Sequence, residues 1–191
     1  MNWILQGRCW KFGDNLSLDD DILEFAKVFV QGVRVSDPAQ LKRHVFTNLI
    51  PDFPERAKPG DIVVAGKRFG QGNPHIYGLL GMRGLGLGLV AESVPRFTYR
   101  MLVAAGLPSL PFCPEITKRV EDGDQLRVDF AAGRIEDLSR GLSVEAEPLP
   151  AALLEIIALG GSTQALRKRL TEERRPPGGE RAPAPREPSR A

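Results

Sequence analysis

Residues 61–112 alternate between short apolar runs and stretches of helical spacing, and this order constrains the fold more than any other feature. Residues 61–65, 87–91 and 109–112 are short and apolar, as is typical of buried strands. Residues 75–83 and 96–104 lie between them and carry apolar side chains at helical intervals. A strand–helix–strand–helix–strand order predicts a parallel sheet flanked by helices, and therefore an α/β fold.

Strand patterns also lie outside this unit. Residues 3–12 predict a strand that ends at the turn formed by residues 13–15. Residues 125–130 alternate between polar and apolar side chains, turn at residues 131–133 and continue through 134–138, which predicts a β-hairpin. The predicted sheet is therefore only partly parallel.

Helix signals lie before and after the central unit. Asp37 and Pro38 predict a helix that runs to residue 46, and residues 51–59 are predicted to form a loop. Residues 151–159 predict a helix that ends at two glycines, after which Ser162 can cap a last helix to Leu170.

The last 21 residues differ in composition from the rest. Residues 171–191 consist of Pro, Gly, charged and small residues, and none of them is large and apolar. Such a segment cannot bury enough surface to order itself, so we predict a disordered tail. Residues 1–170 are then expected to form one domain.

Composition excludes several classes of protein. The formal net charge is +2 with acids and bases mixed, and no basic block carries interleaved aromatic residues, so we expect no nucleic-acid partner. The longest apolar stretches are interrupted by Gly, Pro or charge, so no membrane span is expected. Residues 1–8 lack the pattern of a signal peptide, and we expect a cytoplasmic protein.

The chain has few residues that could bind a metal. Its two cysteines, Cys9 and Cys113, and its two histidines, His44 and His75, show no metal-ligand spacing. An iron–sulfur cluster needs about four thiolates, so any such cluster would have to lie on another chain. We expect both cysteines to be buried apolar residues, and we assign no metal site.

A glycine turn follows the strand at residues 61–65. Gly70 and Gly72 would let a ligand approach the backbone, and Asn73 and Pro74 are favoured at the start of a helix. Free N–H groups at a helix start favour a carboxylate or phosphate. The turn is either such an anion site or a plain connection; the Gly-Lys-Ser/Thr of a Walker loop is missing.

Three consecutive acids, Asp19, Asp20 and Asp21, precede an apolar run. Acids suit the first turn of a helix, and we expect a short helix or an irregular segment with a solvated start. A calcium loop is the alternative, but the spacing fails the EF-hand pattern.

Several motifs in order resemble the 3-isopropylmalate dehydratase small subunits of the aconitase family. These motifs are Lys11-Phe12-Gly13-Asp14-Asn15, Asp19, Asp37-Pro38, His44-Val45-Phe46, the stretch 59–66, Phe69-Gly70, Gly72, Gly106-Leu107-Pro108, and the stretch 146–150. The resemblance covers residues 7–170. It implies a swivelling β/β/α domain that closes over a large subunit holding a [4Fe-4S] cluster. The implied reaction is the loss and re-addition of water on a hydroxy di- or tricarboxylate, in leucine biosynthesis.

The glycine turn departs from the family pattern, which reads Gly-x-Gly-Ser-Ser-Arg-Glu-His. In this register Asn73 takes the place of the serine that removes the substrate proton, and an amide is no useful base. Pro74 replaces the second serine, and His75 replaces the arginine that binds substrate carboxylate. Asp19 matches an active-site aspartate of the family.

Three functions stay open at this point. The first is a hydro-lyase small subunit with rearranged chemistry, in which Asp19 and His75 are catalytic. Its predicted substrate-binding residues are Arg68, Gly70, Gly72, Asn73 and Tyr77. The second is a non-catalytic relative that keeps the fold and the partner, and the third is a carboxylate-binding regulatory subunit.

Overall fold

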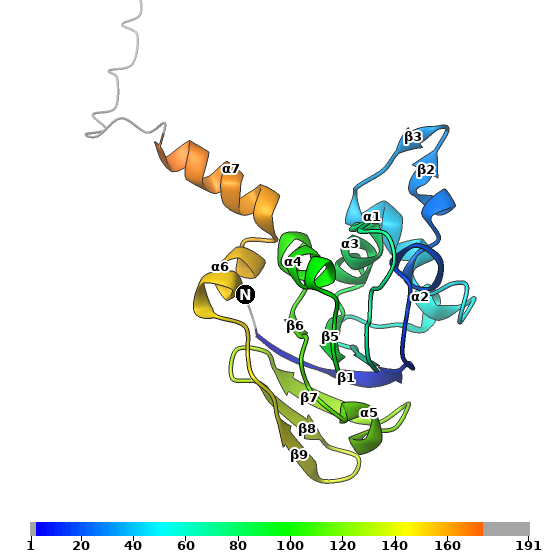
Figure 1. Ribbon diagram of the computed structural model, residues 1–191, viewed down its shortest axis with the longest axis vertical. Coiled ribbons are helices and arrows are strands. Elements are labelled where there is room, and N and C mark those ends of the chain that lie inside the picture. The colour runs from blue at the N-terminus through cyan, green and yellow to red at the C-terminus, as the bar shows by residue number, and fades with distance from the viewer. Residues whose placement is uncertain (1–2, 174–191) are drawn as a thin grey trace, which may run out of the picture.

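A seven-stranded sheet forms the centre of the computed structural model, which describes residues 3–173 (Figure 1). The strand order is β6-β5-β4-β1-β7-β8-β9. Neighbouring strands from β6 to β1 are parallel, and those from β1 to β9 are antiparallel. The strands are β1 (Ile4–Lys11), β4 (Ile62–Ala65), β5 (Gly88–Ala91), β6 (Ser109–Leu110), β7 (Gln125–Asp129), β8 (Arg134–Asp137) and β9 (Leu142–Glu145). The prediction of a partly parallel α/β fold is confirmed.

Helices cover the parallel half of the sheet on one side, and the antiparallel strands curl away on the other (Figure 1). The α-helices are α1 (Pro38–Leu41), α2 (Phe53–Arg56), α3 (Tyr77–Gly84), α4 (Arg96–Ala105), α5 (Ile116–Arg119), α6 (Ala151–Ala158) and α7 (Ser162–Glu173). Single turns of π or 3-10 helix occupy Leu18–Ile22, Phe25–Val28 and Lys42–His44. A separate hairpin, β2 (Phe29–Val30) with β3 (Val33–Arg34), projects from the body.

The apolar character of β4 follows from its position between two cores. Val63 and Ala65 face the larger core, which the helices α3 and α4 cover. Ile62 and Val64 face a second core that is shared with β7 and β8. Because both faces are buried, the strand is a continuous apolar run, as expected for the parallel strands of an α/β sheet.

The prediction that the glycine turn opens a helix at Asn73 is wrong. Helix α3 begins at Tyr77, and its N-cap residue Ile76 makes no capping hydrogen bond from its side chain. The Asn73 carbonyl instead accepts the His75 N–H at 2.8 Å, so Asn73, Pro74 and His75 form a tight three-residue turn. The proline therefore shapes a turn that precedes the helix.

The boundaries of the other elements differ less from those predicted. The segment 51–59, predicted as a loop, contains the one-turn helix α2, and β9 was not predicted. Helix α7 extends to Glu173, three residues past its predicted end at Leu170, and residues 174–191 lie outside the described residues. No helix within residues 3–173 has the length and apolar character needed to cross a membrane.

Candidate active site

The candidate site lies where β1 and β4 end, at the carboxyl edge of the parallel strands. Gly70 and Gln71 both donate their N–H groups to the Leu16 carbonyl, at 2.8 and 3.0 Å. Leu18 donates its N–H to the Gln71 carbonyl at 3.0 Å. These bonds join the glycine turn to the segment that follows β1, at the edge where α/β sheets usually bind their ligands.

A local cap positions Asp19. The Ser17 hydroxyl oxygen accepts the N–H groups of Asp19 and Asp20 at 3.2 and 3.3 Å, and Asp21 accepts the Ser17 N–H at 2.7 Å. Leu18 and Ile22 anchor this turn in the core. The expectation of a solvated acidic start holds for Asp20, which is exposed, whereas the Asp19 side chain is only 15% exposed.

Asp19 and His75 form a hydrogen-bonded pair. Asp19 Oδ1 lies 2.7 Å from His75 Nδ1, although 56 residues separate them in the chain. A carboxylate can only accept here, so Nδ1 carries the proton and a neutral ring keeps its free lone pair on Nε2. The imidazole stacks on the Phe25 ring, with 4.1 Å between ring centres and 10° between planes. The pair thus has the orientation of an aspartate-supported general base.

The other predicted site residues belong to the glycine turn or follow it closely in the chain. The Tyr77 ring centre is 6.3 Å from that of His75. Gly72 and Asn73 are exposed in the turn just before His75. Arg68 directs its Nε to Asn15 Oδ1 at 2.6 Å, so the side chain is held toward the segment after β1.

Gly70 has a packing role in addition to any role at the site. Its φ of +77° lies in the left-handed region, and a Cβ there would lie 2.6 Å from Thr98 Cγ2. Its N–H is already used by Leu16, so the expected free donor is missing at this position. A glycine is required here for the fold, and a ligand would have to use other groups of the turn.

Sequence reasoning missed Phe25 and Ser17. Phe25 supports the imidazole by stacking, and Ser17 caps the turn that carries Asp19. The serine stands two residues before the acids, so its capping role was visible in the pattern. No local signal marks Phe25, because its contact with His75 spans 50 residues of chain.

Both cysteines are buried, as expected. Burial raises the pKa of the Cys9 thiol to about 12 and that of the Cys113 thiol to about 11, with nearby carboxylates adding to the effect. Thiols of this kind stay protonated near neutral pH and are poor metal ligands. Among residues 3–173, no group of three or more His, Cys, Asp or Glu side chains is placed to hold a metal ion.

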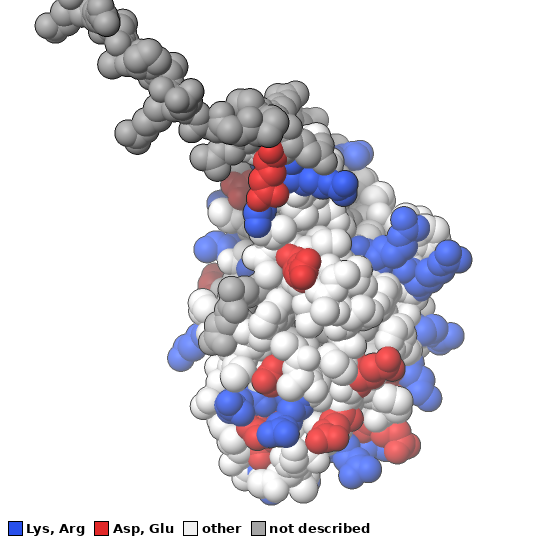
Figure 2. Space-filling view, turned by 90° about the vertical axis from the view of Figure 1, so that its left-hand side faces the viewer, with Lys and Arg blue, Asp and Glu red and all other residues white. Residues whose placement is uncertain are grey.

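The surface charges are dispersed on the face shown in Figure 2. Lys and Arg side chains are interspersed with Asp and Glu, and uncharged areas separate them. This face offers no continuous basic stripe of the kind that binds nucleic acid.

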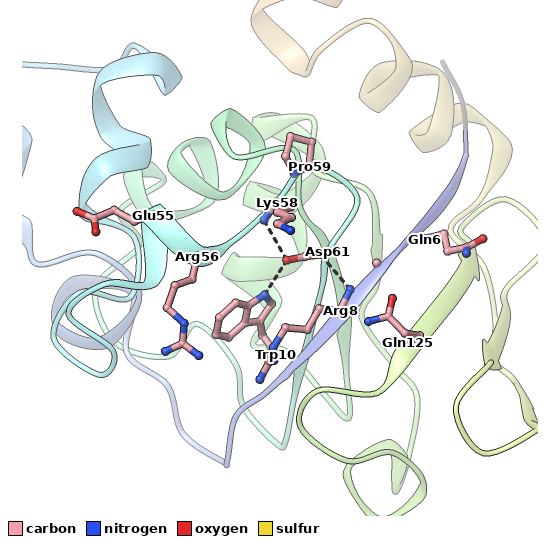
Figure 3. Close-up of a pocket in the computed structure, with 10 residues that line it drawn as sticks. Gln6, Arg8, Trp10, Glu55, Arg56, Lys58, Pro59, Asp61 and Gln125 are labelled. Atoms are coloured by element: carbon pink, nitrogen blue, oxygen red, sulfur yellow. Dashed lines mark hydrogen bonds between the residues drawn. The ribbon is translucent and has the colours of Figure 1, made fainter.

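A hollow of about 580 Å³ lies away from the candidate site, at the opposite edge of the parallel strands (Figure 3). Its floor contains Asp61, whose carboxylate accepts three N–H groups: those of Arg8 and Lys58 from the backbone, and Trp10 Nε1. Arg8 itself pairs with Asp122 at 2.7 Å and lies over the Trp10 ring. Because the Asp61 carboxylate is engaged by these three N–H groups, we regard its network as structural.

Comparisons with known proteins agree on one family of relatives. No family model matches the chain. An isopropylmalate/citramalate isomerase small subunit from Methanocaldococcus jannaschii is 38% identical over 173 residues, covering 90% of this chain and 99% of the relative. A 3-isopropylmalate dehydratase small subunit from Halothermothrix orenii is 35% identical, covering 85% and 95%. The solved structure of a 3-isopropylmalate dehydratase from M. jannaschii superposes with a TM-score of 0.78 at 27% identity, covering 89% of this chain and 97% of that one.

Proposed function

Since this chain belongs to the family of 3-isopropylmalate dehydratase small subunits, we propose that Asp19 and His75 are the catalytic pair it contributes to that hydro-lyase. The chain is a small subunit of a two-subunit enzyme of leucine biosynthesis, and a large subunit is its partner. The single observation that supports the catalytic assignment is the 2.7 Å hydrogen bond between Asp19 Oδ1 and His75 Nδ1.

In the proposed mechanism His75 is the base. Its Nε2 takes the proton from the substrate carbon next to a carboxylate, the C–H electron pair forms the double bond, and the hydroxyl group leaves with its own electron pair. Asp19 holds the imidazole in the required tautomer and stabilises the imidazolium that forms. In the reverse direction His75 returns the proton to carbon.

The remaining predicted residues, apart from Gly70, are proposed as substrate contacts. Gly72 and Asn73 stand exposed beside His75, and Tyr77 and Arg68 lie at the borders of the turn. Gly70 lets the turn pass close to Thr98, whose hydroxyl donates to the Gly70 carbonyl at 2.5 Å. An exposed turn of this kind suits a small polycarboxylate once a second subunit closes over it.

We assign the [4Fe-4S] cluster to the large subunit. The cysteines of this chain are buried with raised pKa values, which fits a subunit without cluster ligands. When bound there, the cluster would supply Lewis-acid chemistry to the leaving hydroxyl. The cytoplasmic location stays a prediction from the N-terminal sequence.

The test is anaerobic co-purification with a cognate aconitase-type large subunit, followed by an assay of hydration of unsaturated dicarboxylates. His75→Ala should lower kcat by about 10²–10⁴-fold while the complex still assembles, because a general base contributes on that order. Asp19→Asn should also lower kcat by orders of magnitude, since it permits the wrong tautomer and removes the charge that stabilises the imidazolium.

His44→Ala is the matched control, because His44 is the other histidine of the chain and lies in the turn Lys42–His44. It should leave turnover unchanged. Full turnover by the His75→Ala complex would remove His75 from the mechanism. A complex that assembles without turnover on any dicarboxylate would instead favour an accessory or regulatory subunit.

A further inference from the structure

Two residues beside the glycine turn have backbone conformations that residues other than glycine rarely adopt. Asn15, in the segment after β1, has a φ of +66°, and Arg68, in the turn after β4, has a φ of +57°. Asparagine tolerates this left-handed region, whereas the same region is unfavourable for arginine. Residues in such conformations persist only where the surrounding contacts fix them, and they are concentrated at functional sites.

Asn15 and Arg68 are hydrogen-bonded to each other, and the backbone around both is fixed. Arg68 donates from Nε to Asn15 Oδ1 at 2.6 Å, and its backbone N–H donates to Ser93 Oγ at 3.0 Å. Asn15 donates its backbone N–H to the Lys67 carbonyl at 2.8 Å. The Asn15 carbonyl accepts a hydrogen bond from Gln71 Nε2, also at 2.8 Å. The direction of the guanidinium is therefore set by the segment after β1.

The contact between Asn15 and Arg68 is one of three that join the same two segments. Residues of the segment after β1 meet residues of the glycine turn in parallel order: Asn15 with Arg68, Ser17 with Gln71, and Asp19 with His75. This order continues the parallel pairing of β1 with β4 beyond the strand ends. Four residues of extended chain span at most about 14 Å. Arg68 and the candidate catalytic pair therefore lie at the two ends of one short surface.

Arg68 keeps both its charge and two of its amino groups for a ligand. The residue is exposed, and it makes no ion pair within residues 3–173. With Nε bound to Asn15, the two terminal nitrogen atoms have no partner among the described residues, and together they can bond both oxygen atoms of a carboxylate. His75 cannot make this contact, because an imidazole lacks the fork geometry and this one is bound to Asp19.

The chemistry of Asn15 suits this arrangement because its side chain is a neutral amide. Its Oδ1 accepts the Arg68 Nε–H and so orients the guanidinium without neutralising the positive charge. An aspartate at the same position would hold the arginine as well. It would also pair with the charge that a bound carboxylate needs.

We propose that Asn15 is a positioning residue, which holds Arg68 so that its two terminal nitrogen atoms bind one carboxylate of the substrate while the Asp19–His75 pair acts at the reacting carbon. The inference rests on the proposed function and gives Asn15 a role within the same site. It requires a hydrogen-bond acceptor without charge at position 15.

The experiment uses the reconstituted complex and compares Asn15→Asp with Asn15→Ala. Asn15→Asp keeps the acceptor and tolerates a positive φ, but its charge competes with the substrate carboxylate for Arg68. It should raise KM for the dicarboxylate about ten- to a hundredfold, with little change in kcat and an unchanged melting temperature. Asn15→Ala should raise KM by a smaller factor, because the released guanidinium keeps its charge. Gln164→Glu, an exposed change on α7, is the control for added negative charge and should leave KM unchanged.

A double-mutant cycle tests whether Asn15 acts through Arg68. Arg68→Gln alone should raise KM at least as much as Asn15→Ala, and the addition of Asn15→Ala to Arg68→Gln should raise KM no further. Two changes with additive effects would show that Asn15 does not act through Arg68. An unchanged KM for Asn15→Asp would show that its acceptor serves only the fold, and would likewise overturn the proposal.

Direct binding separates this proposal from the proposed function. Calorimetric titration of the complex with succinate, an unreactive dicarboxylate, should show binding by the wild type and by His75→Ala, and weaker binding by Asn15→Asp and by Arg68→Gln. If the wild type binds succinate without any turnover, the proposed catalytic pair fails while the Arg68 contact is still judged by the titration. Equal affinities for Asn15→Asp and the wild type, or no succinate binding by the wild type, would overturn the contact.

Discussion

Two aspartates show how surroundings decide what a carboxylate can do. Asp61 is 4% exposed and accepts three N–H groups, from Arg8, Lys58 and Trp10, so both of its oxygen atoms are hydrogen-bonded although it borders the hollow of Figure 3. Asp19 faces a single titratable partner, His75, at the solvent edge. The first arrangement stabilises the fold, and the second can move a proton.

Replacing Asp61 by Asn should destabilise the protein by about 1–3 kcal/mol, because an amide NH₂ would face N–H donors in a buried place. Urea denaturation followed by circular dichroism measures the free energy of unfolding. Asp52→Asn is the control: Asp52 forms an exposed pair with Arg56 at 3.3 Å, and its loss should cost less than about 1 kcal/mol. Equal losses in the two variants would show that the Asp61 network is not structural.

At the scale of elements, the end of α4 is joined to the turn between α6 and α7. Gly106 ends α4 with φ +71°, and a Cβ there would lie 2.6 Å from the carbonyl carbon of Gly160. Arg83 of α3 donates from Nη1 to the carbonyl groups of Ala105 and Gly160, at 2.7 and 2.5 Å. Helices α3 and α4 and the turn between α6 and α7 therefore meet at Gly106, where the space admits only a glycine.

Gly106→Ala should cost more stability than Gly141→Ala, by at least about 1 kcal/mol, because overpacking adds to the strain of a positive φ. Gly141 is the matched variant, since its φ is +68° but nothing lies within 4 Å of the position of a Cβ. Chemical denaturation of both proteins gives the difference. Similar costs would mean that the turn before α7 yields to the added methyl group.

At the scale of the whole molecule, α7 lies at the periphery. Its side chains are mostly exposed. Among the described elements, α7 packs mainly against α4 and α6. Thr171 and Glu172 are exposed, and the sequence beyond them has no large apolar residue. The boundary of the domain near residue 170 stays a prediction.

A chain ended after Leu170 should therefore fold and bind the large subunit normally. The free energy of unfolding should change by less than about 0.5 kcal/mol, as for surface changes that remove no buried contact. Thermal unfolding and co-purification with the large subunit measure the two effects. Loss of soluble protein on truncation would place the end of the domain beyond residue 170.

The order of elements follows from the sequence because strand and helix patterns are local. The buried strand β4, helix α4 with its glycine stop, and the hairpin β7–β8 were all predicted from periodicity and turn residues. The start of the helix after the glycine turn was predicted wrongly, because it depends on contacts that no local pattern contains. Asn73 and Pro74 carry helix-start propensities, but the hydrogen bond from His75 to Asn73 and the packing of α3 move the helix start to Tyr77.

The sequence by itself determined the family, the strand–helix order and the short list of site residues, because each depends on residues close together in the chain. Only the tertiary structure decided that Asp19 meets His75, that Phe25 stacks on the imidazole and that Asn15 holds Arg68. These contacts join segments that the parallel strands bring to one edge of the sheet. No local pattern can contain them, because their geometry is set by how β1 and β4 pair.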